Sequence, residues 1–328
     1  MGFRVIIPGP LTTVQDAGRT GYQSQGFPAG GAMDLRALRL GNLLTDNAEN
    51  EAALEFAFSG PELEFTAPAF IAVTGGDAQP RVNGKSVPMN TALRVRKGDR
   101  LHFGGMRQGM YGYIAFAGGL DIPPVMGCRS TSLACGIGGF QGRKLAAGDE
   151  IRERTPCTRL HHLRARTVPQ TGAESSAFRV IMGPQNGMFT LRGTEIFLTS
   201  EYTVTEETNR MGCRLEGPSV PAKHTSDIIS DGIAPGAIQI SSDGKPIILM
   251  SDRQTTGGYA KIATVITADL PRLAQTRPGT RIRFQAVTLQ EAQAMIRQER
   301  QDMDDLRERF RHPWRRKQCR EGNQDDIR

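Results

Sequence analysis

The chain has 328 residues and a formal net charge of +7, from 41 Lys and Arg against 34 Asp and Glu. Its 38 glycines are about 12 % of the chain, against a usual ~7 %. The length predicts about two domains. Glycine without a three-residue repeat excludes collagen, and the even spread of Leu, Ile, Val and Phe excludes a fully disordered chain. The arginines are mostly interspersed with acids, so we expect no nucleic-acid partner.

The sequence carries no recognisable targeting or metal-binding pattern. It lacks an N-terminal signal-peptide pattern and an apolar run of about 18 residues, so we expect a soluble, cytoplasmic protein that does not enter a membrane. No histidine pair has zinc spacing, and we expect no metal. The cysteines are scattered, odd in number and without C-x-x-C spacing, which predicts free thiols in a reducing compartment: Cys128, Cys135, Cys157, Cys213 and Cys319.

The first half is predicted to be a β domain. Asn83-Gly84 between two short runs is a strong hairpin signal. One helix is predicted over residues 34–44, because Ala37, Leu40 and Leu44 fall on one face. Many short strands without long helices between them favour a barrel or a sandwich. The predicted strands are residues 62–65, 70–73, 92–95, 100–103 and 111–116.

The second half repeats the strand pattern and ends in a helix. Thr288 and Glu291 have the spacing of a capping box, and the periodic apolar residues after them predict a long amphipathic helix that ends before Pro313. The arginine-rich stretch before this half is interpreted as a solvated linker, with a partner-docking or anion-binding strip as the alternative. The predicted strands are residues 178–182, 195–198, 237–240, 247–250 and 280–284.

These patterns divide the chain into five parts. The order is a first β domain, a basic linker, a second β domain, a C-terminal helix and a charged tail. Their predicted bounds are residues 1–155, 156–177, 178–287, 288–312 and 313–328.

A glycine-rich segment at residues 136–143 is a candidate anion site. Backbone amides at Gly138 and Gly139, together with Arg143, would form an anion-binding nest, and the alternative is a tight turn between strands. The segment is neither a Walker loop nor a dinucleotide-binding loop. The chain also lacks a nucleophile elbow. No lysine lies between methionines, so biotin would have to arrive on another chain.

Three further segments combine glycines with carboxamide, hydroxyl or charged side chains. Glycine lets a ligand approach the backbone, and the polar groups can bind it. The alternative is internal hydrogen bonding within long loops. The segments are residues 12–19 with 30–34, residues 209–215, and residues 252–259.

These segments, with residues 123–127, 130–131 and 136–143, resemble the family of the 5-oxoprolinase C subunit, also called KipA or allophanate hydrolase subunit 2. They are also similar to half of the carboxyltransferase region of urea carboxylase. The resemblance runs from about residue 5 to residue 287, in order and with family-like spacing. It implies a mainly β fold of two cyclophilin-like β-barrel domains with a few short helices.

The resemblance also implies function and partners. It implies a hydrolase acting on a cyclic amide, the ATP-dependent conversion of 5-oxo-L-proline to L-glutamate, with a KipI-like protein (the B subunit) and an A-like subunit as partners. ATP would be bound by this chain or by a partner. One alternative is a carboxyltransferase component acting on urea or another small amide, with biotin supplied in trans. Another is a KipA-type regulator that binds a KipI-like kinase inhibitor.

Residue types suggest roles at the positions that match the motifs. A carboxylate is needed as general base, an arginine fork can hold an anion, and neutral donors can bind an amide. Arg19 or Arg210 would pair with an anion, and Tyr259 would close the pocket. The catalytic candidates are Asp16, Asp34, Arg210 and Asp252, and the substrate-binding candidates are Gln15, Arg19, Gln254, Thr255, Thr256 and Tyr259.

Two positions depart from the family pattern. Ala260 stands where proline usually follows the third motif, which predicts a looser end to that loop. Cys213 stands where an aromatic residue is common. Neither change removes a charge or a hydrogen-bonding group.

Overall fold

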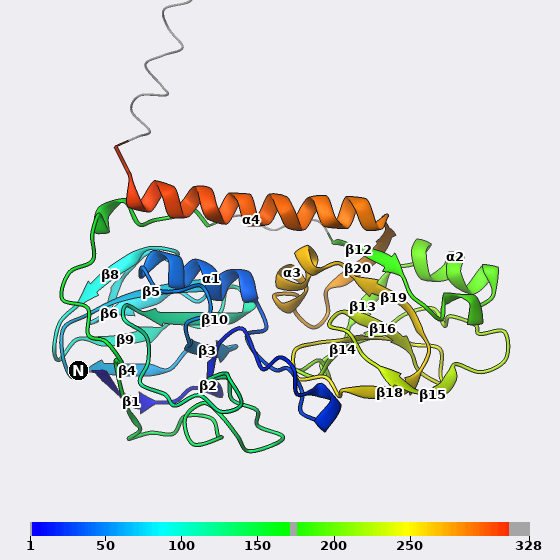
Figure 1. Ribbon diagram of the computed structural model, residues 1–328, viewed down its shortest axis with the longest axis horizontal. Helices are drawn as coiled ribbons and strands as arrows, with labels where there is room; N and C mark the ends of the chain where they lie inside the picture. The colour runs from blue at the N-terminus through cyan, green and yellow to red at the C-terminus, as the bar shows by residue number, and fades with distance from the viewer. Residues whose placement is uncertain (1, 171–175, 315–328) are drawn as a thin grey trace, which may run out of the picture.

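The computed structural model describes residues 2–170 and 176–314. Two β-rich halves lie side by side, and one long helix runs across both (Figure 1). No helix within these two ranges is both long and apolar enough to cross a membrane.

The first half consists of two sheets with a shared apolar core. Phe3 of one sheet stacks on Phe116 of the other, with 4.7 Å between the ring centroids. The first sheet has the order β11 (Glu150–Arg152), β1 (Gly2–Ile7), β4 (Glu62–Phe65), β9 (Arg100–Phe103), β6 (Pro80–Val82), β7 (Lys85–Ser86). The second has the order β2 (Leu11–Gln15), β3 (Ala53–Ala57), β10 (Gln108–Phe116), β5 (Ala69–Asp77), β8 (Ala92–Val95).

The second half is a closed barrel. It closes because β12 pairs in parallel with β20 and antiparallel with β19. In order, its strands are β12 (Ala177–Met182), β19 (Lys261–Val265), β16 (Ala237–Ile240), β17 (Pro246–Leu249), β14 (Gly212–Glu216), β13 (Tyr202–Val204) and β20 (Arg281–Ala286). A separate ribbon pairs β15 (Asp227–Gly232) with β18 (Thr256–Tyr259).

Two short helices lie close to the junction between the halves. Helix α1 (Leu35–Leu44) begins where the Asp34 side chain accepts a 2.8 Å hydrogen bond from the backbone N–H of Ala37, and it packs on β5 and β10. Helix α3 (Leu270–Ala274) contacts α1 and β10 from the second half. These contacts place side chains of the two halves close enough to interact directly with one another.

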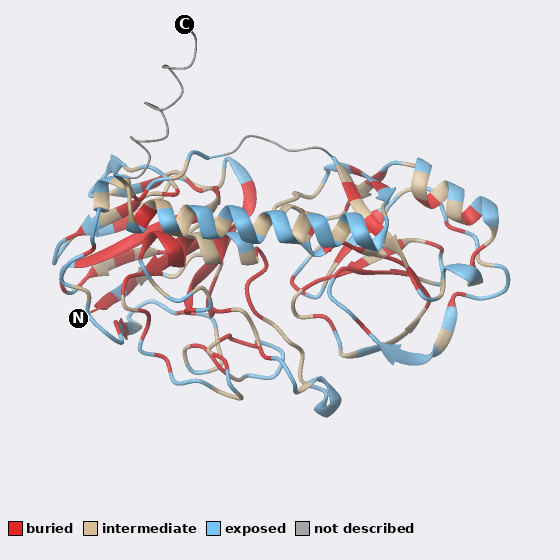
Figure 2. Cartoon of the chain, turned by 45° about the horizontal axis from the view of Figure 1, so that its top comes forward, coloured by how far each residue is buried: buried red, intermediate tan, exposed pale blue. Residues whose placement is uncertain are grey.

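Helix α4 (Leu289–Arg311) follows directly on the last barrel strand and returns across the first half. Both hydrogen bonds of the Thr288–Glu291 capping box are formed. Most of its outward surface is exposed (Figure 2), but Phe310 near its end is 1 % exposed and packs with Leu43, Leu44 and Phe70 of the first half. The helix therefore links the barrel to the first half.

The basic stretch before the second half also has a structural use. The buried Arg166 donates to the carbonyls of Leu43 (3.0 Å) and Leu44 (3.3 Å) and lies 3.1 Å from Asp46. Its guanidinium lies over the ring of Phe310. Carbonyls at a helix end lack intrahelical partners, and a cation there is favourable. Arg166 thus stabilises the end of α1.

The strand predicted at residues 195–198 is wrong, because these residues lie in helix α2 (Leu191–Thr199). The hydroxyl of Thr190 accepts a 2.9 Å hydrogen bond from the N–H of Gly193 and caps the helix. Phe197 then stacks on Phe284 of β20, with 4.6 Å between the centroids. The N-cap and this tertiary contact outweigh the β propensity of the short apolar run.

The other predictions of the fold are confirmed in part. The chain is mainly β with few helices, and its second half is a closed barrel, whereas the first half has two separate sheets. Likeness to cyclophilin and the five-part division stay predictions. Within the predicted linker, residues 171–175 lie outside the described residues, as do residues 315–328 of the predicted tail, including Cys319.

Candidate functional site

The polar segments of the sequence meet where the two halves face each other. Arg210, from the second segment, is buried and reaches across the junction. It binds Asp252 of the third segment through Nε (2.7 Å) and Nη2 (2.9 Å). Its Nη2 also donates to the carbonyl oxygen of Gly31 (2.7 Å), and its Nη1 donates to Glu55 of β3. One guanidinium therefore joins all these segments.

Glu55 is the central residue that sequence reasoning missed. Its carboxylate accepts hydrogen bonds from Arg210, from the hydroxyl of Tyr113 (2.7 Å) and from the backbone N–H of Met33 (2.8 Å). Burial raises its pKa, while the charge of Arg210 opposes that rise. The sequence feature that indicates Glu55 is an acidic residue inside the apolar run Ala53–Ala57, and the structure shows that all residues of this run are buried. A buried acid requires a partner.

The charge of Arg210 is secured by these carboxylates. Burial alone would lower the pKa of Arg210, but Glu55 and Asp252 raise it above its ordinary value. Glycine at position 31 lets this loop pack closely against the backbone at Gly18, because its φ is +88° and a Cβ there would lie 2.9 Å from the Cα of Gly18. The loop at residues 30–32 is further held by the 3.1 Å bond from Gly30 N to Ser251 O.

Asp34 links the halves a second time. Its Oδ2 accepts a 2.8 Å hydrogen bond from Nε2 of Gln275, whose Oε1 accepts from the N–H groups of Met110 and Tyr111. Burial raises the pKa of Asp34 from 3.8 to about 6, and the hydrogen bonds from Gln275 and Ala37 oppose part of that rise. A carboxylate with a pKa of about 6 is suited to accept a proton near neutral pH.

The raised pKa predicts a pH dependence of stability. Between pH of about 4 and 6 the folded state binds more protons at Asp34 than the unfolded state, so the free energy of unfolding falls as pH rises. Two pKa units correspond to about 3 kcal/mol. Urea unfolding of the native chain and of Asp34→Asn at pH 4 and pH 7 checks this. The native chain should lose stability relative to the variant on going to pH 7, and a relative gain would contradict the assignment.

Asp16 is used to hold the first loop. Its Oδ1 accepts from the backbone N–H of Gly18 (2.9 Å) and from the hydroxyl of Ser130, and its Oδ2 accepts from the N–H of Arg129. The neighbouring Gln15 is buried; its Nε2 donates to Thr131 O (3.2 Å) and its Oε1 has no partner among the described residues. The matching segments 12–19 and 130–131 are thus in direct contact.

The third segment is more accessible. Gln254 and Thr256 are exposed, and Thr255 and Tyr259 are half-buried. Thr256 begins β18, whose ribbon with β15 leaves the barrel, so this segment and the residues from Gly212 onward are partly strand rather than wholly loop. Its amide and hydroxyl groups remain available to a ligand.

The glycine-rich segment lies against Arg19. A Cβ on Gly138 would lie 3.0 Å from Nη2 of Arg19 and 2.1 Å from Ser130 O, and one on Gly139 would lie 1.8 Å from Thr131 Oγ1. Arg143 instead binds both carboxylate oxygens of Asp149, at 2.7 and 2.8 Å. The anion-binding role of Gly138, Gly139 and Arg143 stays a prediction.

Neither departure from the family pattern loosens the site. Ala260 is fully buried, and its N–H donates a 2.7 Å hydrogen bond to Ser226 O, which a proline could not make. The looser loop end expected from the missing proline is therefore not seen. Cys213 is buried, and burial raises the pKa of its thiol to about 11, so it is not a reactive thiolate.

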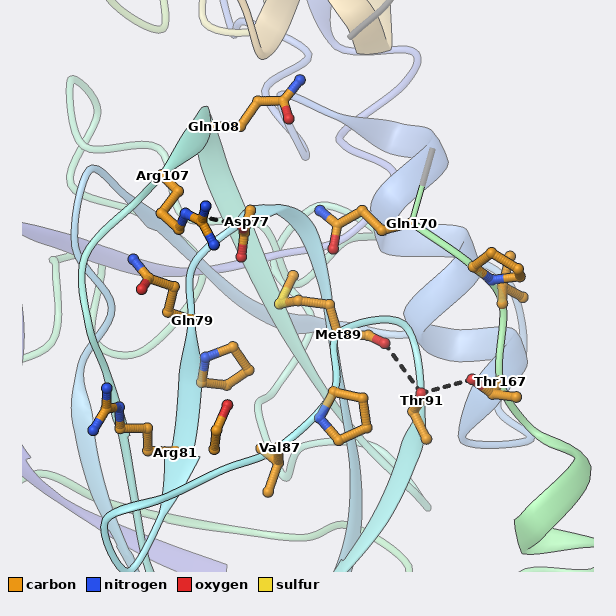
Figure 3. A pocket seen from close by; sticks show the side chains of 15 residues that line it. Asp77, Gln79, Arg81, Val87, Met89, Thr91, Arg107, Gln108, Thr167 and Gln170 are labelled. Carbon is orange, nitrogen blue, oxygen red and sulfur yellow. Dashed lines mark hydrogen bonds and ion pairs between the residues drawn. The ribbon is translucent and has the colours of Figure 1, made fainter. Parts of the chain in front are cut away.

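A separate cavity lies away from these residues. A volume of about 650 Å³ opens on the first half, between the β6–β7 hairpin and residues 167–170 (Figure 3). Four of its polar side chains pair with one another: Thr91 with Thr167 at 2.8 Å, and Arg107 with Asp77 at 3.9 Å. It contains none of the predicted site residues and no buried charged group, so size alone does not make it the functional site.

Comparisons with known proteins identify the family of the chain. A family model described as carboxyltransferase domain, subdomain A and B, matches residues 25–286. The chain is 38 % identical over 290 residues to the 5-oxoprolinase C subunit of Escherichia coli strain K12, across 88 % of this chain and 93 % of the relative. The identity to the 5-oxoprolinase C subunit of Haemophilus influenzae is 37 % over 295 residues, across 90 % and 94 %.

A solved structure shows the same architecture. The urea carboxylase of Kluyveromyces lactis superimposes with a TM-score of 0.85 and 30 % identity, across 93 % of this chain and 29 % of that longer chain. The fold and the polar junction therefore define a two-part β protein of the carboxyltransferase type. The chain belongs to the carboxyltransferase domain family with subdomains A and B.

Proposed function

We propose that this chain is one component of an ATP-dependent 5-oxoprolinase, which opens 5-oxo-L-proline to L-glutamate together with an A-like and a B-like partner protein. The observation that carries the proposal is the identity of 38 % to a 5-oxoprolinase C subunit, which covers 88 % of this chain and 93 % of the relative. ATP is bound by this chain or by a partner.

The chemistry of the junction supports action on an amide. The amide of 5-oxoproline is neutral, so it is recognised by carboxamide and hydroxyl groups such as those of Gln254, Thr255 and Thr256. Its opening consumes one water and needs a proton acceptor near neutral pH, and Asp34 has the raised pKa for that role. Arg210, which is bound to Asp252, joins the two halves near this position through its hydrogen bonds to Glu55 and to the carbonyl oxygen of Gly31.

A second candidate is a carboxyltransferase component that acts on urea or another small amide. The superposition on urea carboxylase, with a TM-score of 0.85, favours it. Biotin would be supplied in trans in that reaction. In both candidates the substrate is a poorly reactive amide, so the same neutral donors serve either reaction.

The test is reconstitution with both partners. The chain is co-expressed with the A-like and B-like proteins from the same genome, and ADP release is measured with and without 5-oxo-L-proline. We expect co-purification and 5-oxoproline-dependent ADP and glutamate formation that disappears when this chain is omitted. A complex that instead transfers the carboxyl group of carboxybiotin to urea, without 5-oxoproline turnover, would overturn the proposal.

A further inference from the structure

The guanidinium of Arg19 is a buried positive charge with no counter-ion among the described residues. The residue is 1 % exposed, and its single side-chain hydrogen bond runs from Nη2 to Ser130 O at 3.2 Å. Its Nε and Nη1 are shielded from solvent and have no partner among the described residues. No carboxylate of those residues forms an ion pair with it. At least three of its donor hydrogens are therefore unused.

The three other buried arginines among the described residues have more partners than Arg19: Arg253 donates to the carbonyls of Ile233 and Met250 through Nε and Nη1, and Arg166 and Arg210 have carboxylates. Arg166 has Asp46 at 3.1 Å and the carbonyls at the end of α1, and Arg210 has Glu55 and Asp252. Leaving a buried charge uncompensated costs several kcal/mol. The carboxylate of Asp16 lies in the same loop, but its oxygens accept from Gly18, Arg129 and Ser130. Arg19 thus lacks the partner that the fold gives to Arg166 and Arg210.

The backbone of Gly138 lies close to the guanidinium of Arg19 on one side. Gly138 has a φ of +69°, and a Cβ there would lie 2.1 Å from Ser130 O and 3.0 Å from Nη2 of Arg19, so a side chain at this position would displace the loop from both groups. The segment Ser130–Thr131 lies between Arg19 and the amide of Gln15, whose buried Oε1 is also without a partner among the described residues. Arg19 and Gln15 therefore both have unused hydrogen-bonding atoms, and residues 130–131 contact both side chains.

We propose that Arg19 receives the carboxylate of the small-molecule ligand, with the loop of residues 136–142 beside the bound carboxylate. This proposal rests on the proposed function and makes it more specific, because the sequence offers three arginines, Arg19, Arg143 and Arg210, as anion-binding candidates. Arg210 and Arg143 already hold carboxylates of the protein, and of these three only Arg19 offers a free fork for bidentate binding. The carboxylate has two possible sources: the acid group of 5-oxoproline, or a carboxyl group that is transferred to or from a carrier.

Calorimetric titration of the purified full-length chain separates these sources. The probes are 5-oxo-L-proline, 2-pyrrolidinone (the same ring without the carboxylate) and bicarbonate. We expect 5-oxo-L-proline to bind at least tenfold more tightly than 2-pyrrolidinone, and Arg19→Gln to remove that preference. Arg4→Gln, which removes an exposed arginine paired with Glu150, is the matched control and should bind like the native chain.

The outcomes distinguish this proposal from the proposed function. Arg19-dependent binding of bicarbonate but not of 5-oxoproline supports Arg19 as the carboxylate site and counts against the 5-oxoprolinase. Binding of 5-oxoproline that is equal in the native chain and in Arg19→Gln overturns the role of Arg19 and leaves the 5-oxoprolinase standing. Absence of Arg19-dependent binding of either carboxylate also overturns it. If Arg19→Gln does not fold, Arg19→Lys decides: it keeps the charge but loses the fork, so affinity should fall about tenfold.

Discussion

Replacing Arg210 by methionine is expected to lower the free energy of unfolding by about 3–5 kcal/mol, because the change leaves the carboxylates of the buried Glu55 and the half-buried Asp252 without their cation. Methionine keeps much of the side-chain volume, so the effect isolates the charge. Both carboxylates must then take up protons or water, and the hydrogen bond to Gly31 O is also lost. Urea unfolding at pH 7 measures the change.

The matched control is Arg214→Met in the same segment. Arg214 pairs with Glu207 at 3.3 Å, but both side chains are mostly exposed, so its loss should change stability by less than about 1 kcal/mol. The triple variant Glu55→Gln, Arg210→Met, Asp252→Asn removes the charges together and should recover part of the loss. If Arg210→Met were as stable as Arg214→Met, the junction would not depend on this buried network.

Phe310→Ala is expected to destabilise the chain by about 3–5 kcal/mol. The ring is 1 % exposed and packs with Leu43, Leu44 and Phe70, and the guanidinium of Arg166 lies over it. Its removal leaves a cavity under the end of α4 and frees the contact that attaches the helix to the first half. Thermal and urea unfolding measure the loss.

Leu289→Ala at the start of the same helix is the control for Phe310. Leu289 is 56 % exposed, so its truncation should change the free energy of unfolding by less than about 0.5 kcal/mol. Equal effects of the two substitutions would show that α4 does not gain its stability from the Phe310 contact.

Local patterns predicted the features that depend on neighbouring residues. Asn83 and Gly84 form the turn between β6 and β7 with φ of +51° and +78°, the values that two-residue hairpin turns demand. The capping box at Thr288 and Glu291 is formed for the same reason, because its hydrogen bonds lie within four residues. The error at residues 195–198 arose where a cap at Thr190, five residues earlier, decides the conformation.

The candidate site was predictable only in part, because it depends on how the halves meet. The polar segments were identified from composition, and the structure brings Asp34, Arg210 and Asp252 to the junction. The pairing of Glu55 with Arg210 spans 155 positions and leaves no local pattern. The position of Arg19 beneath Gly138 likewise depends on a contact between distant loops.

The central claim is that function lies at the polar junction and not in the separate cavity of the first half, and substitutions of two glutamines test this claim directly. Gln254 belongs to the third segment, and Gln108 lines the 650 Å³ cavity. Both are exposed, and neither side chain forms a hydrogen bond with the described residues, so alanine at either position should leave the fold intact.

The measurement is 5-oxoproline-dependent ADP release by the reconstituted complex that carries either substitution. Loss of one amide contact to the substrate predicts at least a tenfold lower rate for Gln254→Ala, or about 1.4 kcal/mol of lost stabilisation, with Gln108→Ala within twofold of the native rate. A tenfold loss for Gln108→Ala beside full activity of Gln254→Ala would contradict the claim.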